Sequence, residues 1–202
     1  MNAWLQSRAA KPALFLAASL PLIKLVAGAV SGGLGANPAE VLIRSTGDWT
    51  LRMLCLTLAV TPLRQASGWY ALGKLRRMLG LFSFFYGLLH FLCFAWLDMG
   101  LDPAAILRDI GKRPFILVGT AGFLLMWPLA ATSFHRAIRW LGAVRWQRLH
   151  RAVYGVALLG LLHFFWMRSG KNDFGEVAIY AAIIGLLLGW RLWYRWRRPT
   201  TG

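Results

Sequence analysis

Three histidines lie within long apolar stretches of the sequence. His150 and His163 are near the two ends of the run 149–166, and His90 lies in a second run, FFYGLLHFLCFAW. Ionisable side chains are uncommon inside a segment of hydrocarbon length, and they mark candidate functional sites. A neutral imidazole is also the commonest protein ligand for a metal or a haem iron. These residues therefore indicate metal or haem binding inside a membrane.

The elements that must hold these histidines are long apolar runs. Of the 202 residues, 58% are hydrophobic, whereas a soluble domain has about 45–50%. The excess falls in six runs, each close to the roughly 20 residues that cross a bilayer as a helix. The sequence therefore predicts an all-α polytopic membrane protein, a single domain over residues 1–202 built as a bundle of six transmembrane helices. The expected spans are 11–30, 49–63, 79–97, 115–133, 149–167 and 177–196.

Charge asymmetry between alternate connecting segments predicts the orientation of these spans. The formal net charge is +16. With the N-terminus in the cytoplasm, most Lys and Arg residues fall on the cytoplasmic side, and all 7 acidic residues fall on the opposite side or at its membrane edge. We therefore expect both termini in the cytoplasm. The positive charge is assigned to topology and to contact with anionic membrane lipid, and not to nucleic acid.

This orientation places His90 and His163 at similar depth. Both lie in the outer halves of helices that run in the same direction. Two neutral imidazoles from facing helices can supply both axial positions of a haem iron. Glycines near the two histidines would let a bulky flat ring approach the backbone; they are Gly80, Gly87, Gly155 and Gly160.

His150 is expected about 20 Å deeper than His163, at the cytoplasmic edge, because an α-helix rises 1.5 Å per residue. On a straight helix the two rings would point about 140° apart. They can therefore serve two redox centres only if the helix bends or if neighbouring helices approach from different sides. Arg76 and Arg77 are either topology determinants or a clamp for haem propionates. His135 is expected to be a solvated or lipid-facing residue.

Two other classes of function stay open at this point. One is a small-solute transporter whose histidines line a water-filled path, and the other is a structural membrane anchor for a peripheral enzyme. The spans carry no carboxylate, which argues against ion-coupled transport, and the sequence contains no hydrolase, zinc-protease or nucleotide-binding motif. Cys55 and Cys93 both lie in apolar runs and are expected to be small buried hydrophobes.

Four long blocks of the sequence carry a family resemblance. They are TGDWTLRMLCLTLAVTPLR, RRMLGLFSFFYGLLHF, GKRPFILVGTAGFLLMWPLAATS and LGAVRWQRLHRAVYGVALLGLLHFFW. The chain resembles the MsrQ family, also called YedZ, from about residue 11 to the last span. These are the haem-binding membrane subunits of the bacterial periplasmic methionine sulfoxide reductase system, with ferric-reductase-like transmembrane domains.

The resemblance implies one or two haem b groups, with His90, His150 and His163 as metal ligands and Arg76 and Arg77 beside the cofactor. It further implies FMN in many members, and electron supply from the quinone pool or a cytoplasmic flavin reductase. Electrons would leave to a periplasmic molybdopterin subunit that reduces methionine sulfoxide in proteins. The chain would then be a multi-pass protein of the bacterial inner membrane, and an electron-transfer subunit rather than the catalytic one.

The sequence departs from the wider superfamily in two respects. Related proteins carry two histidines about 14 residues apart on the third span, whereas Arg76 stands at the corresponding position before His90. The sequence also lacks a cytoplasmic domain that binds flavin and nucleotide, so reducing equivalents are expected to arrive from another molecule. The outer segments 98–113 and 168–176 are the expected partner surface.

Overall fold

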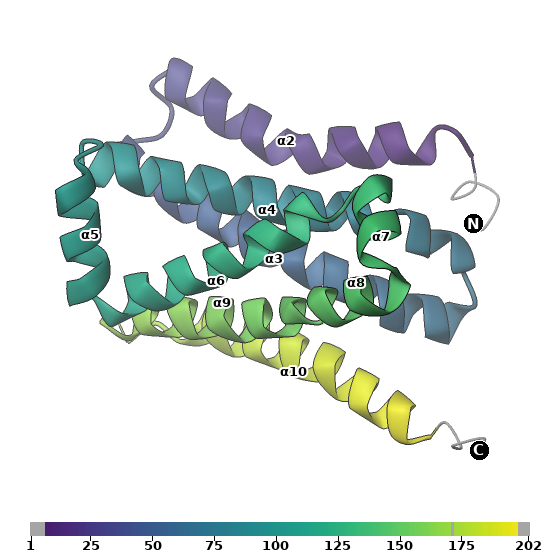
Figure 1. Cartoon of the computed structure of the whole chain (residues 1–202). Helices are drawn as coiled ribbons and strands as arrows, with labels where there is room; N and C mark the ends of the chain where they lie inside the picture. Colours follow the sequence, from purple (N-terminus) through teal and green to yellow (C-terminus); the bar gives the residue numbers. More distant parts are fainter. Residues whose placement is uncertain (1–6, 171, 198–202) are drawn as a thin grey trace.

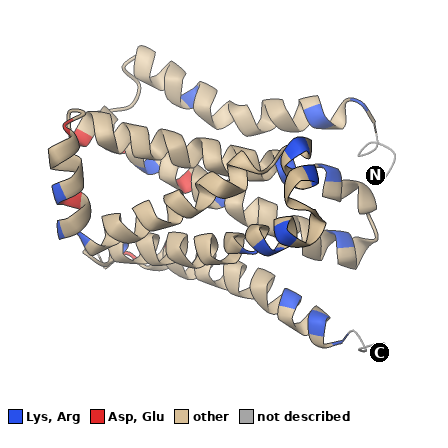
Figure 2. Cartoon of the chain, in the orientation of Figure 1, with Lys and Arg blue, Asp and Glu red and all other residues tan. Residues whose placement is uncertain are grey.

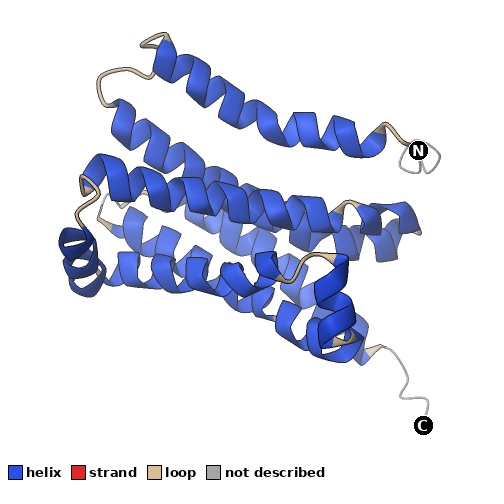
Figure 3. Ribbon diagram, turned by 45° about the horizontal axis from the view of Figure 1, so that its top comes forward, coloured by secondary structure: helices blue, strands red, loops and turns tan. Residues whose placement is uncertain are grey.

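The computed structural model describes residues 7–170 and 172–197, and within them every regular element is a helix (Figure 3). Six long helices form the bundle (Figure 1): α2 (Ala10–Val30), α3 (Pro38–Ser67), α4 (Arg76–Cys93), α6 (Pro114–Ala131), α9 (Ala152–Ser169) and α10 (Gly175–Trp196). The short elements are η1 (Tyr70–Lys74), a single π-helical segment η2 (Phe94–Asp98), α5 (Pro103–Lys112), α7 (His135–Leu141) and α8 (Ala143–His150). The predicted all-helical class is confirmed.

Five helical segments of the described chain are long and apolar enough to cross a membrane: Ala10–Val30, Tyr70–Asp98, Pro114–Ala131, Ala143–Ser169 and Gly175–Trp196. The predicted span 49–63 lies inside α3, which is less apolar because it carries Arg44, Asp48, Arg52 and Arg64. At 1.5 Å per residue, the 30 residues of α3 measure about 45 Å. The exact limits of the six spans stay a prediction.

Helix α3 lies at the centre of the bundle and contributes much of its core. It packs along α4 on one side and contacts α9 and α10 on another, while α6 and α9 form a second close pair (Figure 1). The largest cluster of buried side chains draws on α3, α6, α9 and α10, and includes Leu54, Leu58 and Ile184. Cys55 is buried in this cluster and Cys93 is partly buried, and both are free thiols.

The two ends of the bundle differ in charge. The start of α2 and the end of α10 lie at one end of the bundle, where Lys and Arg gather, and most acidic residues lie toward the other end, which α5 crosses (Figures 1 and 2). Asp102 caps α5 by accepting a hydrogen bond of 2.8 Å from the Ala104 amide. The fold therefore gives the bundle a basic end and an α5 end, the asymmetry that the positive-inside rule describes.

The predicted span 149–167 is not one uniform helix. Helix α8 ends at His150 and α9 begins at Ala152. Around Arg151 the backbone tightens into i→i+3 hydrogen bonds, from the Arg151 amide to Arg148 at 3.2 Å and from the Tyr154 amide to Arg151 at 3.0 Å. His150 and His163 therefore lie on either side of a tightened turn within the helical segment Ala143–Ser169, which is not the straight helix assumed for the expected angle.

Candidate functional site

His90 of α4 and His163 of α9 face each other near the α5 end of the bundle. Their ring centroids are 6.0 Å apart and their planes are inclined by 73°. Both rings are partly buried between helices. The structure thus brings together the two histidines that the sequence placed at matched depth.

A backbone carbonyl fixes the orientation of each ring. The Nδ1 atom of His90 lies 2.8 Å from the carbonyl oxygen of Ile43 on α3, and Nδ1 of His163 lies 2.6 Å from that of Phe115 on α6. A carbonyl only accepts, so Nδ1 of each ring carries the hydrogen. Each neutral imidazole then keeps an unshared electron pair on Nε2, and no described residue forms a hydrogen bond with either Nε2.

Two glycines let these rings approach the neighbouring helices. A Cβ atom added at Gly119 would lie 2.6 Å from Nδ1 of His163, and one at Gly47 would lie 3.1 Å from Nδ1 of His90. Neither glycine stood out in the sequence. The available signal was weak, because a glycine inside an apolar helix is common wherever helices pack closely.

This pair fits the axial ligands of a haem. Metal–imidazole bonds are about 2 Å long, so two rings on opposite sides of one metal place their centroids roughly 6 Å apart. The observed separation of 6.0 Å agrees. The donor set is also suitable, because haem iron accepts neutral imidazole and because hydrogen bonding at the remote nitrogen fixes the tautomer of such ligands. Within the described residues no group of three or more His, Cys, Asp or Glu side chains could hold a metal ion, so a haem pair fits better than a multidentate metal site.

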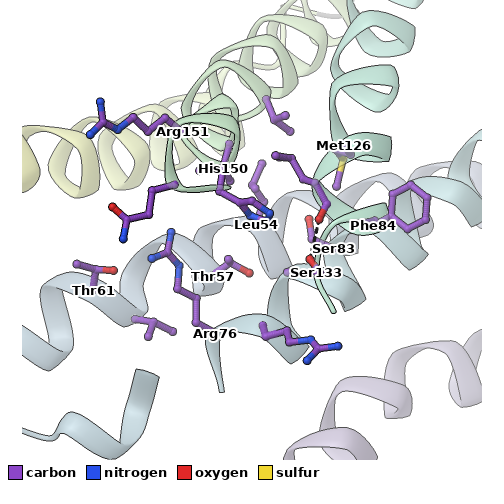
Figure 4. A pocket seen from close by; sticks show the side chains of 18 of the residues that line it. Leu54, Thr57, Thr61, Arg76, Ser83, Phe84, Met126, Ser133, His150 and Arg151 are labelled. Atoms are coloured by element: carbon purple, nitrogen blue, oxygen red, sulfur yellow. Dashed lines mark hydrogen bonds between the residues drawn. The ribbon is translucent and has the colours of Figure 1, made fainter. Parts of the chain in front are cut away.

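A second candidate site is a cavity of about 510 Å³ at the basic end of the bundle. Arg76 and His150 both extend into it (Figure 4). Its lining contains four arginines and no carboxylate among the described residues. The arginines are Arg64, Arg76, Arg77 and Arg151. Such a cavity suits an anionic group, since guanidinium pairs with carboxylate or phosphate in bidentate geometry.

His150 is held differently from the outer pair. Its Nε2 lies 3.1 Å from Oγ1 of Thr132, at the end of α6. The ring stacks on Trp146, with centroids 3.9 Å apart, and the Trp146 indole donates a hydrogen bond of 2.8 Å to the Thr132 carbonyl. His150 is therefore fixed at the wall of the cavity, away from His90 and His163, which do not line it.

The remaining predicted residues lie at or near this cavity. Arg77 is exposed, and His135 is exposed at the cavity rim, as expected for a solvated or lipid-facing residue. Gly80 also lines the cavity. The other predicted glycines pack closely on neighbouring helices; a Cβ at Gly155 or Gly160 would meet a leucine side chain within 4.0 Å.

More than half of the chain matches a known protein family. Residues 46–161 match the family described as ferric reductase like transmembrane component. The matched segment contains Gly47, His90, Gly119 and His150, and it ends two residues before His163. No solved structure shows a significant match to the chain.

Three similar proteins are each named protein-methionine-sulfoxide reductase heme-binding subunit MsrQ. That of Polaromonas naphthalenivorans is 60% identical over 96% of this chain and 89% of its own length. That of Ralstonia nicotianae is 54% identical over 96% and 90%. That of Rhodospirillum rubrum is 46% identical over 98% and 94%.

Proposed function

Because this chain belongs to the MsrQ family of haem-binding subunits, within the ferric-reductase-like transmembrane components, we propose that it is the membrane electron carrier of a protein-methionine-sulfoxide reductase system. It holds haem b between helices, accepts electrons at the basic end or from within the bilayer, and passes them to a partner at the α5 end. The observation that carries this proposal is the mutual position of His90 and His163.

His90 and His163 would hold the outer haem between α4 and α9. When bound, the haem iron supplies the chemistry by cycling between its ferric and ferrous states, one electron at a time. The protein residues supply ligation and surroundings: Nε2 of each ring is available to the iron, and each Nδ1–H is held by a backbone carbonyl. Hydrogen bonding at Nδ1 raises the basicity of the ligand, which favours the ferric state.

The basic cavity holds a second haem, with His150 as a ligand and Arg76 and Arg77 beside its propionates. Its size and its surplus of guanidinium groups support this assignment. The same cavity chemistry fits the phosphate of FMN, the other cofactor that the family resemblance implies. The ratio of haem to protein decides between one and two haems, and released flavin reports FMN directly.

The electron acceptor is a periplasmic molybdopterin subunit that reduces methionine sulfoxide in oxidised proteins. The donor is quinol in the inner membrane or a flavin reductase in the cytoplasm. In this orientation both termini and the basic end are cytoplasmic, as the charge asymmetry predicts. The surface for the acceptor comprises 98–113 and 168–176, of which residue 171 lies outside the described residues.

Electron transfer across vesicles tests this function. The purified chain is reconstituted with the molybdopterin subunit outside and the donor either in the membrane, as quinol, or inside, as flavin reductase with its reductant. We expect sulfoxide reduction with the unaltered chain and with H135A, and only the rate of protein-free vesicles with H90A or H163A. Equal rates for all four proteins would overturn the proposal. The donor is identified by which of the two conditions, quinol in the membrane or flavin reductase inside, supports sulfoxide reduction.

A further inference from the structure

We propose that Gly47 and Gly119 are positioning residues for the two outer haem ligands. Each glycine opens a place on a helix where an imidazole ring can lie against the backbone and donate its Nδ1–H to a carbonyl. We call these two places the α3 seat, made of Ile43 and Gly47, and the α6 seat, made of Phe115 and Gly119. The inference rests on the proposed function, because it concerns the same ligand pair.

The two seats are built in the same way. In each, the glycine follows the accepting carbonyl by four residues: Gly47 follows Ile43 on α3, and Gly119 follows Phe115 on α6. The ligand lies 47 residues after the carbonyl in the first case and 48 residues after it in the second. The helix pairs α3–α4 and α6–α9 therefore present their histidines by one local design, although no sequence repeat connects them.

The spacing of four residues has a physical reason. In an α-helix the carbonyl of residue i is paired with the amide of residue i+4, and the side chain at i+4 starts beside that carbonyl. Serine and threonine use this position to hydrogen-bond back to residue i, as Thr50 does to Thr46 at 2.8 Å. With glycine at i+4, the second lone pair of the carbonyl is open to a group from another helix.

The distances from an added Cβ atom to the histidine rings show how little room each seat leaves. A Cβ at Gly119 would meet three ring atoms of His163, at 2.6, 2.9 and 3.1 Å. A Cβ at Gly47 would lie 3.1 Å from both Cε1 and Nδ1 of His90. Non-bonded carbon atoms prefer about 3.5–4.0 Å. Alanine at position 119 therefore forces the His163 ring or its surroundings to shift, whereas alanine at position 47 requires the His90 ring to move by a few tenths of an ångström, so the α6 seat is the tighter of the two.

Neither glycine is explained by helix stability, because alanine is the better helix former. The seats instead determine which nitrogen faces the iron and how the two ring planes are set. They also keep the Nδ1–H bonds in place without any other side chain, so both ligands receive the same kind of hydrogen-bond acceptor. Gly47 and Gly119 thereby act on the haem through His90 and His163.

Alanine substitutions with matched glycine controls test the seats. The test variants are G119A and G47A. The controls are G122A, on α6 one turn further along, where the added Cβ would make an ordinary contact of 3.5 Å with Leu159, and G185A on α10, where it would meet nothing within 4 Å. For each protein, the electron paramagnetic resonance (EPR) spectrum of the ferric outer haem and its reduction potential are measured, together with haem content and elution as a single folded species.

We expect G119A to weaken ligation of the iron by His163 about fivefold or more, as the loss of one hydrogen bond would, and therefore to reduce the low-spin signal. We expect G47A to shift the g values and the potential while keeping haem. G122A and G185A should match the unaltered protein. Identical spectra and potentials for G119A, G47A and G122A would show that Gly47 and Gly119 do not position the two ligands. If G119A is not recovered as a folded species, the comparison of G47A with G185A decides. If the low-spin signal survives in H163A, the proposed haem ligation is itself wrong. This outcome distinguishes failure of the proposed function from failure of the glycine proposal alone.

Discussion

Thr132 holds His150 through Nε2, and its own hydroxyl hydrogen is already in use. Oγ1 of Thr132 donates to the carbonyl of Pro128 at 2.6 Å and lies 3.1 Å from Nε2 of His150. A hydroxyl has one hydrogen, so toward His150 it can only accept. Nε2 of the neutral ring therefore carries the hydrogen, and Nδ1 keeps the free electron pair, the reverse of the arrangement in His90 and His163.

From this arrangement we predict that T132V weakens the inner haem. Valine keeps the shape of threonine but removes the acceptor that fixes the ring, and loss of such a partner costs roughly tenfold in affinity. T132S keeps a hydroxyl and should bind like the unaltered protein. Haem titration followed by absorbance measures both. Tighter binding in T132V would show that the bond to Thr132 is broken when haem binds.

Arg191 is expected to stabilise the bundle by serving a carbonyl that a proline leaves unpaired. Pro62 has no amide hydrogen, so the Leu58 carbonyl lacks its helical partner, and the Arg191 guanidinium donates to that carbonyl from α10. The same side chain lies over the ring of Tyr154, 5.6 Å from its centroid. We predict that R191M lowers the free energy of unfolding by about 2 kcal/mol, the cost of an unsatisfied buried acceptor.

A double-mutant cycle isolates this contribution. In P62A the new amide can pair with the Leu58 carbonyl, so R191M should cost about 1 kcal/mol less in that background. Unfolding in a detergent titration, followed by circular dichroism, provides the four free energies. An equal cost of R191M in both backgrounds would mean that Arg191 acts through Tyr154 rather than through Leu58.

Exogenous ligands test the carbonyl of the α6 seat, which no substitution can remove. In H163G, imidazole should fill the vacated space and restore six-coordinate haem. 1-Methylimidazole can ligate the iron but lacks an N–H to donate to Phe115, so we predict that it binds about fivefold more weakly, for a hydrogen bond worth about 1 kcal/mol. The same pair of ligands, tested on a free haem model compound, corrects for intrinsic basicity. Equal corrected affinities would show that the Phe115 carbonyl does not contribute to ligand binding.

Arg76 and Arg77 should contribute unequally to the basic cavity. Arg76 is partly buried and extends toward the interior (Figure 4), whereas Arg77 is exposed. An exposed ion pair is screened by water and is worth little, so we predict that R76Q weakens binding of the inner haem about tenfold and R77Q less than about threefold. Haem titration at low and high salt measures both. A larger effect of R77Q would contradict the placement of the propionates beside Arg76.

Hydropathy and charge were sufficient to predict much of the architecture, because a bilayer imposes strict rules on length, polarity and the side on which Lys and Arg lie. The same rules placed His90 and His163 at one depth, and the structure brings them together. Depth can be derived from residue position along a helix, since the rise per residue is constant.

The seats could not be predicted in this way. Whether Gly119 meets a histidine depends on how α6 and α9 are rotated and packed, and nothing near residue 119 in the sequence specifies a ring 44 residues later. The tightening at Arg151 has no proline or glycine signal either. The contact between Thr132 and His150 likewise depends on how the helices pack. The sequence alone therefore does not predict which nitrogen of His150 carries the hydrogen.

Low-temperature EPR of the purified ferric protein tests whether His90 and His163 bind the same iron. We expect a low-spin signal of a bis-imidazole haem that disappears in H90A and, separately, in H163A, while H135A and H150A retain it. If that signal persisted in either H90A or H163A, the two histidines would not share an iron.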